Sequence, residues 1–219
     1  MEISRLCLEG RAAECARELT FSATVAYDGA PFAGFAKQPG QLTVQGELEQ
    51  ALSLLFRRPV DVVCAGRTDA GVHARGPVVS FDIDECELRG RTPYHLRRSL
   101  NALTCEGIVV RAVEERPRGF SARFDAQWRE YKYFLATGDT PPVFTDRTAW
   151  YVGPSLDIAA MERGATHLIG EHDFKSFCMA ASAVGKPTCR NVEEISIASE
   201  EILGEPHRVI TVRGNAFLH

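Results

Sequence analysis

The residues best suited to chemistry lie in one short segment, residues 64–76, which reads CAGRTDAGVHARG. It holds a single carboxylate, Asp69, close to Arg67 and His73 and between glycines at positions 66, 71 and 76. Glycine allows positive φ and close backbone approach, so the segment can be shaped around a ligand. A carboxylate kept ionised by a neighbouring guanidinium can attack an electrophilic carbon without a metal or cofactor. Asp69 is therefore a candidate nucleophile.

Three other interpretations of this segment have to be weighed. Its glycine spacing imitates the start of a phosphate-binding P-loop, but Val72 and His73 stand where Lys and Ser or Thr are required, which excludes nucleoside triphosphate binding. Asp69 could instead cap local amides in a tight turn and pair with Arg67, which would be a structural role. A cofactor-free glycosidase would need a second acid about 5–10 Å from Asp69, and no motif supplies one.

The surrounding elements must hold this segment in place. Behind Thr43 as N-cap, apolar residues at helical spacing predict a helix over 44–57. Thr92 and Pro93 predict the start of another helix, which apolar residues carry onward to Leu103. Alternating and β-branched runs predict strands over 20–28, 60–65, 78–82 and 108–113. The segment that carries Asp69 therefore joins the strands expected over 60–65 and 78–82.

The second half of the chain also mixes strands with a helix. Apolar and polar residues alternate from 126 to 137, which is typical of a long strand with one solvent-exposed face. Further strands are expected at 192–198 and 207–213. Ser155 as N-cap and Gly170 as a stop bound a helix between them. Connections in both halves are often too short for parallel crossovers, so the expected fold class is α+β with mainly antiparallel sheets.

The composition of the 219-residue chain is that of an ordinary soluble globular protein, with 45% hydrophobic and 25% charged residues. A net charge of −4 argues at first against a polyanionic partner. Between Arg89 and Lys132, however, ten basic residues stand against five acidic ones. Nine of the ten are arginine, which favours fork-like phosphate contacts, although arginines spread over a solvated surface explain so modest an excess more simply.

Cysteine usage and hydropathy indicate the cellular compartment in which the protein is expected. Seven cysteines, an odd number without a C-x-x-C pair, indicate neither a disulfide framework nor a zinc site, and fit a reducing cytoplasm. Residues 1–17 lack the continuous apolar core and cleavage site of a signal peptide. No stretch approaches the roughly 20 apolar residues that cross a bilayer. We therefore expect a cytoplasmic protein with no metal and no membrane contact.

Residues 66–74, GRTDAGVHA, resemble the signature of TruA-type tRNA pseudouridine synthases. Further segments similar to that family are 26–35, 43–46, 120–133, 170–177, 190–192 and 214–219. The resemblance implies the pseudouridine synthase fold, with two similar α/β-sandwich halves. We expect these halves over residues 20–137, with the catalytic loop, and 138–219, truncated at its end, behind an N-terminal extension of residues 1–19.

The resemblance implies an isomerase that converts uridine in tRNA to pseudouridine, breaking the N1–C1′ bond and rejoining the base through C5. By this resemblance, Asp69 would be the nucleophile that forms a covalent intermediate with the nucleotide. Tyr131 would stack on the uracil and is a candidate for proton removal at C5. Arg67 would help keep the target base out of the helix stack. The plainer interpretations are Tyr131 as a core-packing strand aromatic and His73 as a residue that orders the loop.

The resemblance also implies a substrate and an assembly. The substrate is the anticodon stem-loop of tRNA, at positions 38–40, the assembly is a homodimer, and no metal or cofactor is involved. A non-catalytic RNA-binding module that keeps the basic middle is the alternative from a different class. The chain stops at His219, where relatives continue through a segment whose arginine is expected beside the catalytic aspartate. We therefore expect a truncated protein with weak or lost activity.

Overall fold

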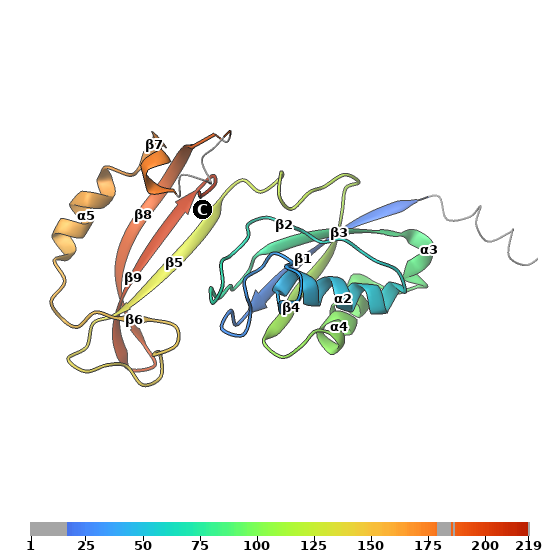
Figure 1. The fold of residues 1–219 in the computed structure, drawn as a ribbon, viewed down its shortest axis with the longest axis horizontal. Helices are drawn as coiled ribbons and strands as arrows, with labels where there is room; N and C mark the ends of the chain where they lie inside the picture. The colour runs from blue at the N-terminus through green and yellow to red at the C-terminus, as the bar shows by residue number, and fades with distance from the viewer. Residues whose placement is uncertain (1–16, 179–184, 186, 219) are drawn as a thin grey trace, which may run out of the picture. The chain divides into compact units, whose positions relative to one another are not determined.

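The computed structural model describes residues 17–178, 185 and 187–218, so the predicted N-terminal extension lies outside the described residues up to position 16. Its contacts divide the chain into two compact units, Met1–Ala126 and Gln127–His219, and each unit is described by itself. Figure 1 shows the helices and strands of both. Within the described ranges, no helix is long and apolar enough to span a membrane.

The first unit is built on a four-stranded antiparallel sheet with the order β2-β3-β1-β4. Its strands are β1 (Glu18–Tyr27), β2 (Val63–Cys64), β3 (Val78–Asp84) and β4 (Ile108–Arg116). The central strand β1 places Phe21 opposite Phe81 of β3, and the two rings stack with centroids 5.9 Å apart. Because successive side chains of a strand point to opposite faces, Leu19, Phe21 and Ala23 share one face of β1.

In the described part of this unit, residues 17–126, two longer helices and one short helix accompany the sheet. They are α2 (Val44–Phe56), α3 (Glu85–Leu88) and α4 (Pro93–Leu103), and α2 and α4 lie along one face of the sheet (Figure 1). The Thr43 hydroxyl accepts a hydrogen bond from the Gly46 amide at 3.2 Å, which satisfies one of the unpaired amides at the start of α2. Pro93 at the start of α4 costs no hydrogen bond, because its position has no helical acceptor. Both predicted helices are confirmed.

A continuous apolar core fills the space between the sheet and these helices. Phe21, Phe35, Leu96 and Leu100 are each at most 2% exposed. Burying one such large side chain contributes about 1.5–3 kcal/mol. Phe35 comes from the loop that precedes α2, so this loop is anchored in the core. The same anchored loop contacts the segment that carries Asp69.

The second unit contains a five-stranded sheet with the order β6-β5-β9-β8-β7. Its strands are β5 (Arg129–Ala136), β6 (Trp150–Tyr151), β7 (Gly170–Asp173), β8 (Cys189–Ile202) and β9 (Glu205–Gly214). Among the strands that the structure describes here, only β5 and β6 pair in parallel. One α-helix, α5 (Ile158–Thr166), and the 3-10 helix η1 (Lys175–Phe177) accompany the sheet (Figure 1). The expected α+β class with mainly antiparallel sheets is confirmed.

A tight turn joins the two long strands of the second unit. Leu203 and Gly204, between β8 and β9, have φ values of 52° and 81°. Two successive residues with positive φ are the feature of a type I′ turn, whose twist matches that of the strands it joins. This turn sets the register in which Ile197 lies opposite Ile210 and Ala198 opposite Val209.

The structure corrects the predicted bounds of the helix in the second unit. Asp157, not Ser155, caps α5, and its carboxylate accepts a hydrogen bond from the Ala160 amide at 2.8 Å. The helix ends at Thr166, and Gly170 starts β7 instead of stopping the helix. Ser and Asp are both favoured N-caps, so residue type alone does not choose between them.

Other segments also differ from expectation. The strand expected over 60–65 is reduced to the two residues of β2. The strand expected from 126 begins at Arg129, and it pairs with β9 over its whole length, in the unit that begins at Gln127. Glu18 and Leu19 form the start of β1. Cys86 is disulfide-bonded, which the spacing of the cysteines did not indicate.

Candidate active site

The segment that carries Asp69 forms a loop, residues 66–76, between β2 and β3, here called the Asp69 loop. The two strands bring its ends together, since Cys64 lies opposite Val79 and the Ala65 amide donates to the Val78 carbonyl at 2.9 Å. The Cys64 thiol donates to the Gly66 carbonyl at 2.9 Å. Both ends of the loop are therefore fixed to the first sheet.

The end of β1 holds the middle of the loop. Tyr27 and Ala74 exchange two backbone hydrogen bonds, of 2.9 and 3.0 Å, and form an antiparallel bridge. The Tyr27 hydroxyl lies 2.7 Å from the Thr68 hydroxyl, and the Tyr27 side chain is buried. Pro77, which has no amide to donate, still accepts a hydrogen bond from the Val25 amide at 3.0 Å. The central strand of the sheet therefore positions the residue directly before Asp69.

The connection that follows β1 holds the loop from a second direction. The Phe35 amide donates to the Thr68 carbonyl at 3.0 Å, and the Gly71 amide donates to the Phe32 carbonyl at 3.4 Å. At Gly34, whose φ is 110°, a Cβ atom would lie 3.0 Å from the Thr68 carbonyl oxygen. The close approach therefore requires glycine at this position.

His73 orders the loop through its ring. Its Nδ1 atom lies 3.0 Å from a carboxylate oxygen of Asp28 and accepts a hydrogen bond from the Gly29 amide at 3.2 Å. At Gly29 a Cβ atom would lie only 2.2 Å from the Val72 carbonyl oxygen. These contacts agree with the expected ordering role of His73. Among the three glycines of the Asp69 loop, Gly71 alone has positive φ, at 78°.

Asp69 and Arg67 are both exposed on this fixed loop. The Asp69 backbone carbonyl accepts a hydrogen bond from the Val72 amide at 3.3 Å. Within the part of the chain that the structure describes, the Asp69 carboxylate accepts no hydrogen bond and forms no ion pair, with Arg67 or any other cation. The capped and paired Asp69 of the structural interpretation is therefore not observed. Its side chain is left available for a ligand.

Tyr131 lies in the middle of β5, in the second unit, opposite Val212 of β9. Its side chain is 38% exposed. The ring packs against Phe217 in a T-shaped contact, with centroids 4.9 Å apart and an interplanar angle of 89°. Tyr131 is therefore not a buried core aromatic, and part of its surface remains open to solvent.

Basic and aromatic side chains surround this strand. The Arg213 guanidinium lies 4.5 Å from the centroid of the Trp128 ring and 3.2 Å from a carboxylate oxygen of Glu193. Arg129 donates to the Asn215 carbonyl at 2.6 Å. Cations interleaved with aromatic rings suit single-stranded nucleic acid, whose bases stack and whose phosphates attract guanidinium groups. Arg213 and Phe217 were not among the predicted site residues. Pairing with β9 brings Arg213 beside β5, and a ring contact brings Phe217 to Tyr131, and the sequence shows neither.

The basic residues between Arg89 and Lys132 have different partners. Arg116 and Arg118 form ion pairs with Glu114 and Glu18. Arg97 and Arg98 instead pack over the ring of Tyr94 on α4, 5.4 and 5.9 Å from its centroid. Among the described residues, no group of three or more His, Cys, Asp or Glu side chains is placed to hold a metal ion.

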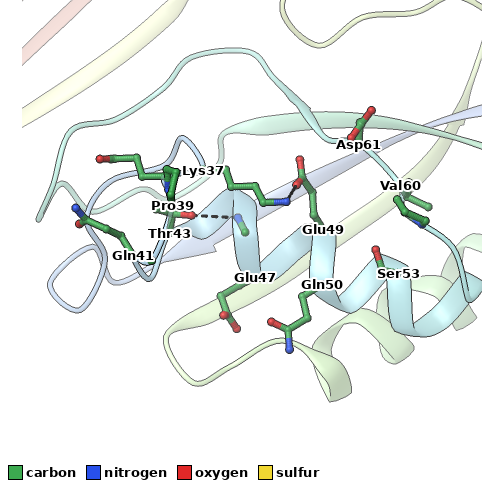
Figure 2. Close-up of a pocket in the computed structure, with 14 residues that line it drawn as sticks. Lys37, Pro39, Gln41, Thr43, Glu47, Glu49, Gln50, Ser53, Val60 and Asp61 are labelled. Carbon is green, nitrogen blue, oxygen red and sulfur yellow. Dashed lines mark hydrogen bonds and ion pairs between the residues drawn. The ribbon is translucent and has the colours of Figure 1, made fainter.

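A hollow of about 700 Å³ lies elsewhere in the first unit, between residues 37–41, α2 and residues 59–61 (Figure 2). Neither Asp69 nor Arg67 lines it. Three of its lining residues are acidic: Glu47, Glu49 and Asp61. No residue of the Asp69 loop lines this hollow.

The family model described as tRNA pseudouridine synthase matches residues 23–125 and 165–219. A protein named tRNA pseudouridine synthase A from Brevibacillus brevis is 43% identical over 195 residues, which cover 89% of this chain and 76% of that relative. The protein of the same name from Halalkalibacterium halodurans is 40% identical, over 89% of this chain and 71% of the relative. The one from Thermotoga neapolitana is 37% identical, over 90% and 77%.

These matches define the class of protein. The chain belongs to the tRNA pseudouridine synthase family and is an isomerase. The resemblance drawn from residues 66–74 is thereby confirmed. The part matched by the family model includes Asp69 and Arg67, whereas Tyr131 falls in the interval between its two matched ranges.

Proposed function

We propose that this protein isomerises uridine to pseudouridine in the anticodon stem-loop of tRNA, at positions 38–40, with Asp69 as the nucleophile. The observation that carries the proposal is the exposed Asp69 carboxylate on a loop held by β1 and by the connection after β1. A loop fixed from two directions presents a reactive group in a defined place, which nucleophilic catalysis requires.

The proposed reaction balances without an added reactant. Asp69 forms a transient bond to the sugar or base of the target nucleotide while the N1–C1′ bond breaks. The freed uracil turns, a new bond joins its C5 to C1′, and the bond to Asp69 breaks, which restores the carboxylate. The proton lost from C5 is balanced by one gained at N1, so substrate and product are isomers. No electron acceptor is required.

Arg67 and Tyr131 are proposed to bind the target base. Extruding a nucleotide from its stack costs a few kcal/mol. Stacking of a base on an aromatic ring returns about 1–3 kcal/mol. The partly exposed ring of Tyr131 can supply that stacking, and the exposed guanidinium of Arg67 can occupy the place that the base leaves. The stacking contribution is comparable to the cost of extrusion.

The direct test is pseudouridine formation in tRNA that carries uridine at positions 38, 39 and 40. The proposal predicts conversion of these uridines. Asp69→Asn should abolish whatever conversion the unaltered chain shows, however slow, and leave tRNA affinity within about twofold, because the two side chains are isosteric and the contacts to phosphates are unchanged. Replacing each uridine in turn by cytidine identifies the positions used. Binding without conversion by the unaltered chain would favour the non-catalytic RNA-binding module instead.

We also propose that the protein acts in the cytoplasm as a homodimer, as its family resemblance implies. Its tRNA substrate supports the compartment. Light scattering at micromolar concentration should give twice the mass of one chain. A mass of one chain at that concentration would contradict the dimer and leave the reaction unaffected.

A further inference from the structure

A buried carboxylate lies on α2, away from the reactive loop. Glu49 is 8% exposed although it carries a charge. One of its oxygens accepts a hydrogen bond from the Lys37 ammonium at 2.9 Å, as Figure 2 shows. Its other oxygen accepts from the Gln45 amide group at 2.8 Å and from the Val62 backbone amide at 3.3 Å. A buried charge is tolerated only when it is paired in this way.

Gln45, one turn earlier on α2, binds the same two segments. Its side-chain oxygen accepts from the Lys37 backbone amide at 3.1 Å, and its side-chain nitrogen donates to the Val62 carbonyl at 3.2 Å. Its backbone amide donates to the Phe35 carbonyl at 2.9 Å. Gln45 and Glu49 thereby join residues 35–37 and Val62 to the first two turns of α2.

Both of these segments lead directly to the reactive residue. Phe35, whose carbonyl is held by Gln45, donates through its own amide to the Thr68 carbonyl, and Thr68 immediately precedes Asp69. Val62, held by Gln45 and by Glu49, immediately precedes β2, whose end begins the Asp69 loop. The network is thus placed to fix the loop at its entry and at its centre.

We infer that Gln45 and Glu49 are positioning residues for Asp69: their hydrogen bonds to residues 35–37 and Val62 set the place of the Asp69 loop. The inference rests on the proposed role of Asp69 as the nucleophile. Neither residue is a catalytic residue, because each acts through the backbone of another segment. Misplacing a reacting group by about 1 Å costs on the order of a hundredfold in rate, so a network that shifts the loop by a fraction of that distance controls turnover.

The first unit supplies a matched control in another ion pair whose carboxylate is largely shielded from solvent. Glu87 of α3 binds Arg58 through both carboxylate oxygens, at 2.6 and 2.7 Å, and accepts from the Asp84 amide at 2.8 Å. The Glu87 side chain is 17% exposed and that of Glu49 is 10% exposed. Among the described residues, none of the hydrogen bonds of Glu87 involves the Asp69 loop.

The experiment compares Glu49→Gln with Glu87→Gln. We measure turnover on tRNA, the melting temperature, and hydrogen exchange of the Phe35 and Gly71 amides, whose acceptors hold the loop in place. We expect both variants to melt at lower temperature by similar amounts. Only Glu49→Gln should lower kcat, by about tenfold with KM within about twofold, and speed exchange of the two amides. Lys37→Met, which removes one partner of Glu49 only, should show the same pattern more weakly.

Each outcome decides the inference. Unchanged kcat and unchanged exchange in Glu49→Gln would overturn it, as would equal losses of kcat in Glu49→Gln and Glu87→Gln, since these would reflect stability alone. Where Glu49→Gln fails to fold, Lys37→Met carries the same comparison. If the unaltered chain makes no pseudouridine, the proposed function fails, and the exchange of the Phe35 and Gly71 amides still decides whether the network holds the loop.

Discussion

The two units of the chain are stabilised in different ways. In the first unit, side chains from β1, β3, β4, α2 and α4 form one continuous apolar core. Among the described residues of the second unit, the buried apolar side chains are few: Leu135, Ala136, Val192 and Val209. Many large apolar side chains of that unit are instead exposed, including Trp128, Tyr133, Val143, Phe144, Trp150 and Phe177. The residue proposed for covalent chemistry belongs to the unit with the continuous core.

A polar cluster in the second unit replaces part of the missing core. His207 is 1% exposed, and its Nε2 atom lies 2.9 Å from the Thr145 hydroxyl. The Glu205 carboxylate accepts from the Thr145 hydroxyl at 2.8 Å and from the Val143 and Phe144 amides at 2.6 and 3.1 Å. Hydrogen bonds thus fix the segment that leads to β6. The difference suits the proposed roles, since a nucleophile needs a rigid mount and a stacking ring tolerates more freedom.

The largest expected effect compares the same substitution in both units. Leu100→Ala in the first unit should cost about 4–5 kcal/mol and Leu135→Ala in the second about 2–3 kcal/mol, because a cavity in a continuous core relaxes less. Both leucines are buried, at 2% and 4% exposure. Urea unfolding followed by circular dichroism measures the cost. Tryptophan fluorescence follows the second unit, because Trp128 and Trp150 are the two tryptophans of the chain. Equal costs would contradict the difference between the units.

The next prediction concerns the proposed stacking ring of the second unit. Tyr131→Leu should lower turnover by about 10–100-fold, since stacking on the ring is worth about 1–3 kcal/mol. Tyr131→Phe keeps the ring, so it separates stacking from any part of the hydroxyl in proton removal. Full turnover in Tyr131→Leu would remove this residue from the site. The Tyr133→Leu variant is the control, because Tyr133 is an exposed tyrosine of the same strand.

The smallest expected effect is the response of both units to acid. A hydrogen bond from Arg58 lowers the pKa of Glu87 below its usual 4.5. Burial opposes the charge of Glu205, but hydrogen bonds led by that of the Val143 amide outweigh it and lower its pKa as well. A carboxyl with a lowered pKa in the folded state adds stability above its unfolded pKa, and this stability is lost as the pH falls through the folded pKa.

Unfolding free energies between pH 6 and pH 3 test this response. Glu87→Gln should be less stable than the unaltered chain by about 1 kcal/mol at pH 6, and the gap should close toward pH 3. Glu205→Gln should show the same convergence in tryptophan fluorescence. If the difference in unfolding free energy between each variant and the unaltered chain stays constant with pH, neither carboxylate contributes to stability through its charge.

Local signals in the sequence were enough to predict part of the fold. The N-caps Thr43 and Thr92 and apolar residues at helical spacing located α2 and α4 closely, because caps and periodicity act within a few residues. β6 was missed, since its two residues have no periodicity and exist as a strand only through pairing with Leu135 and Ala136. α3, with four residues, is likewise too short to show a pattern.

The same limit applies to the site. Asp69 and Arg67 stood out because glycines and charged residues gather within a few positions of the chain. The residues that hold the loop did not, because Phe35 and Tyr27 lie more than thirty positions away and meet it only in the folded chain. The expected guanidinium partner of Asp69 is also not observed at Arg67 among the described residues. Residues close together in the sequence therefore identified Asp69 as the reactive group, but they did not identify the distant residues that hold its loop.

The most direct test of the account is covalent capture of tRNA by Asp69. The chain is incubated with tRNA that carries 5-fluorouridine at positions 38–40, and the products are separated on a denaturing gel. We expect a slowly migrating protein–RNA adduct with the unaltered chain and none with Asp69→Asn. An adduct that survives in Asp69→Asn, or none with a chain that converts uridine in ordinary tRNA, would contradict it.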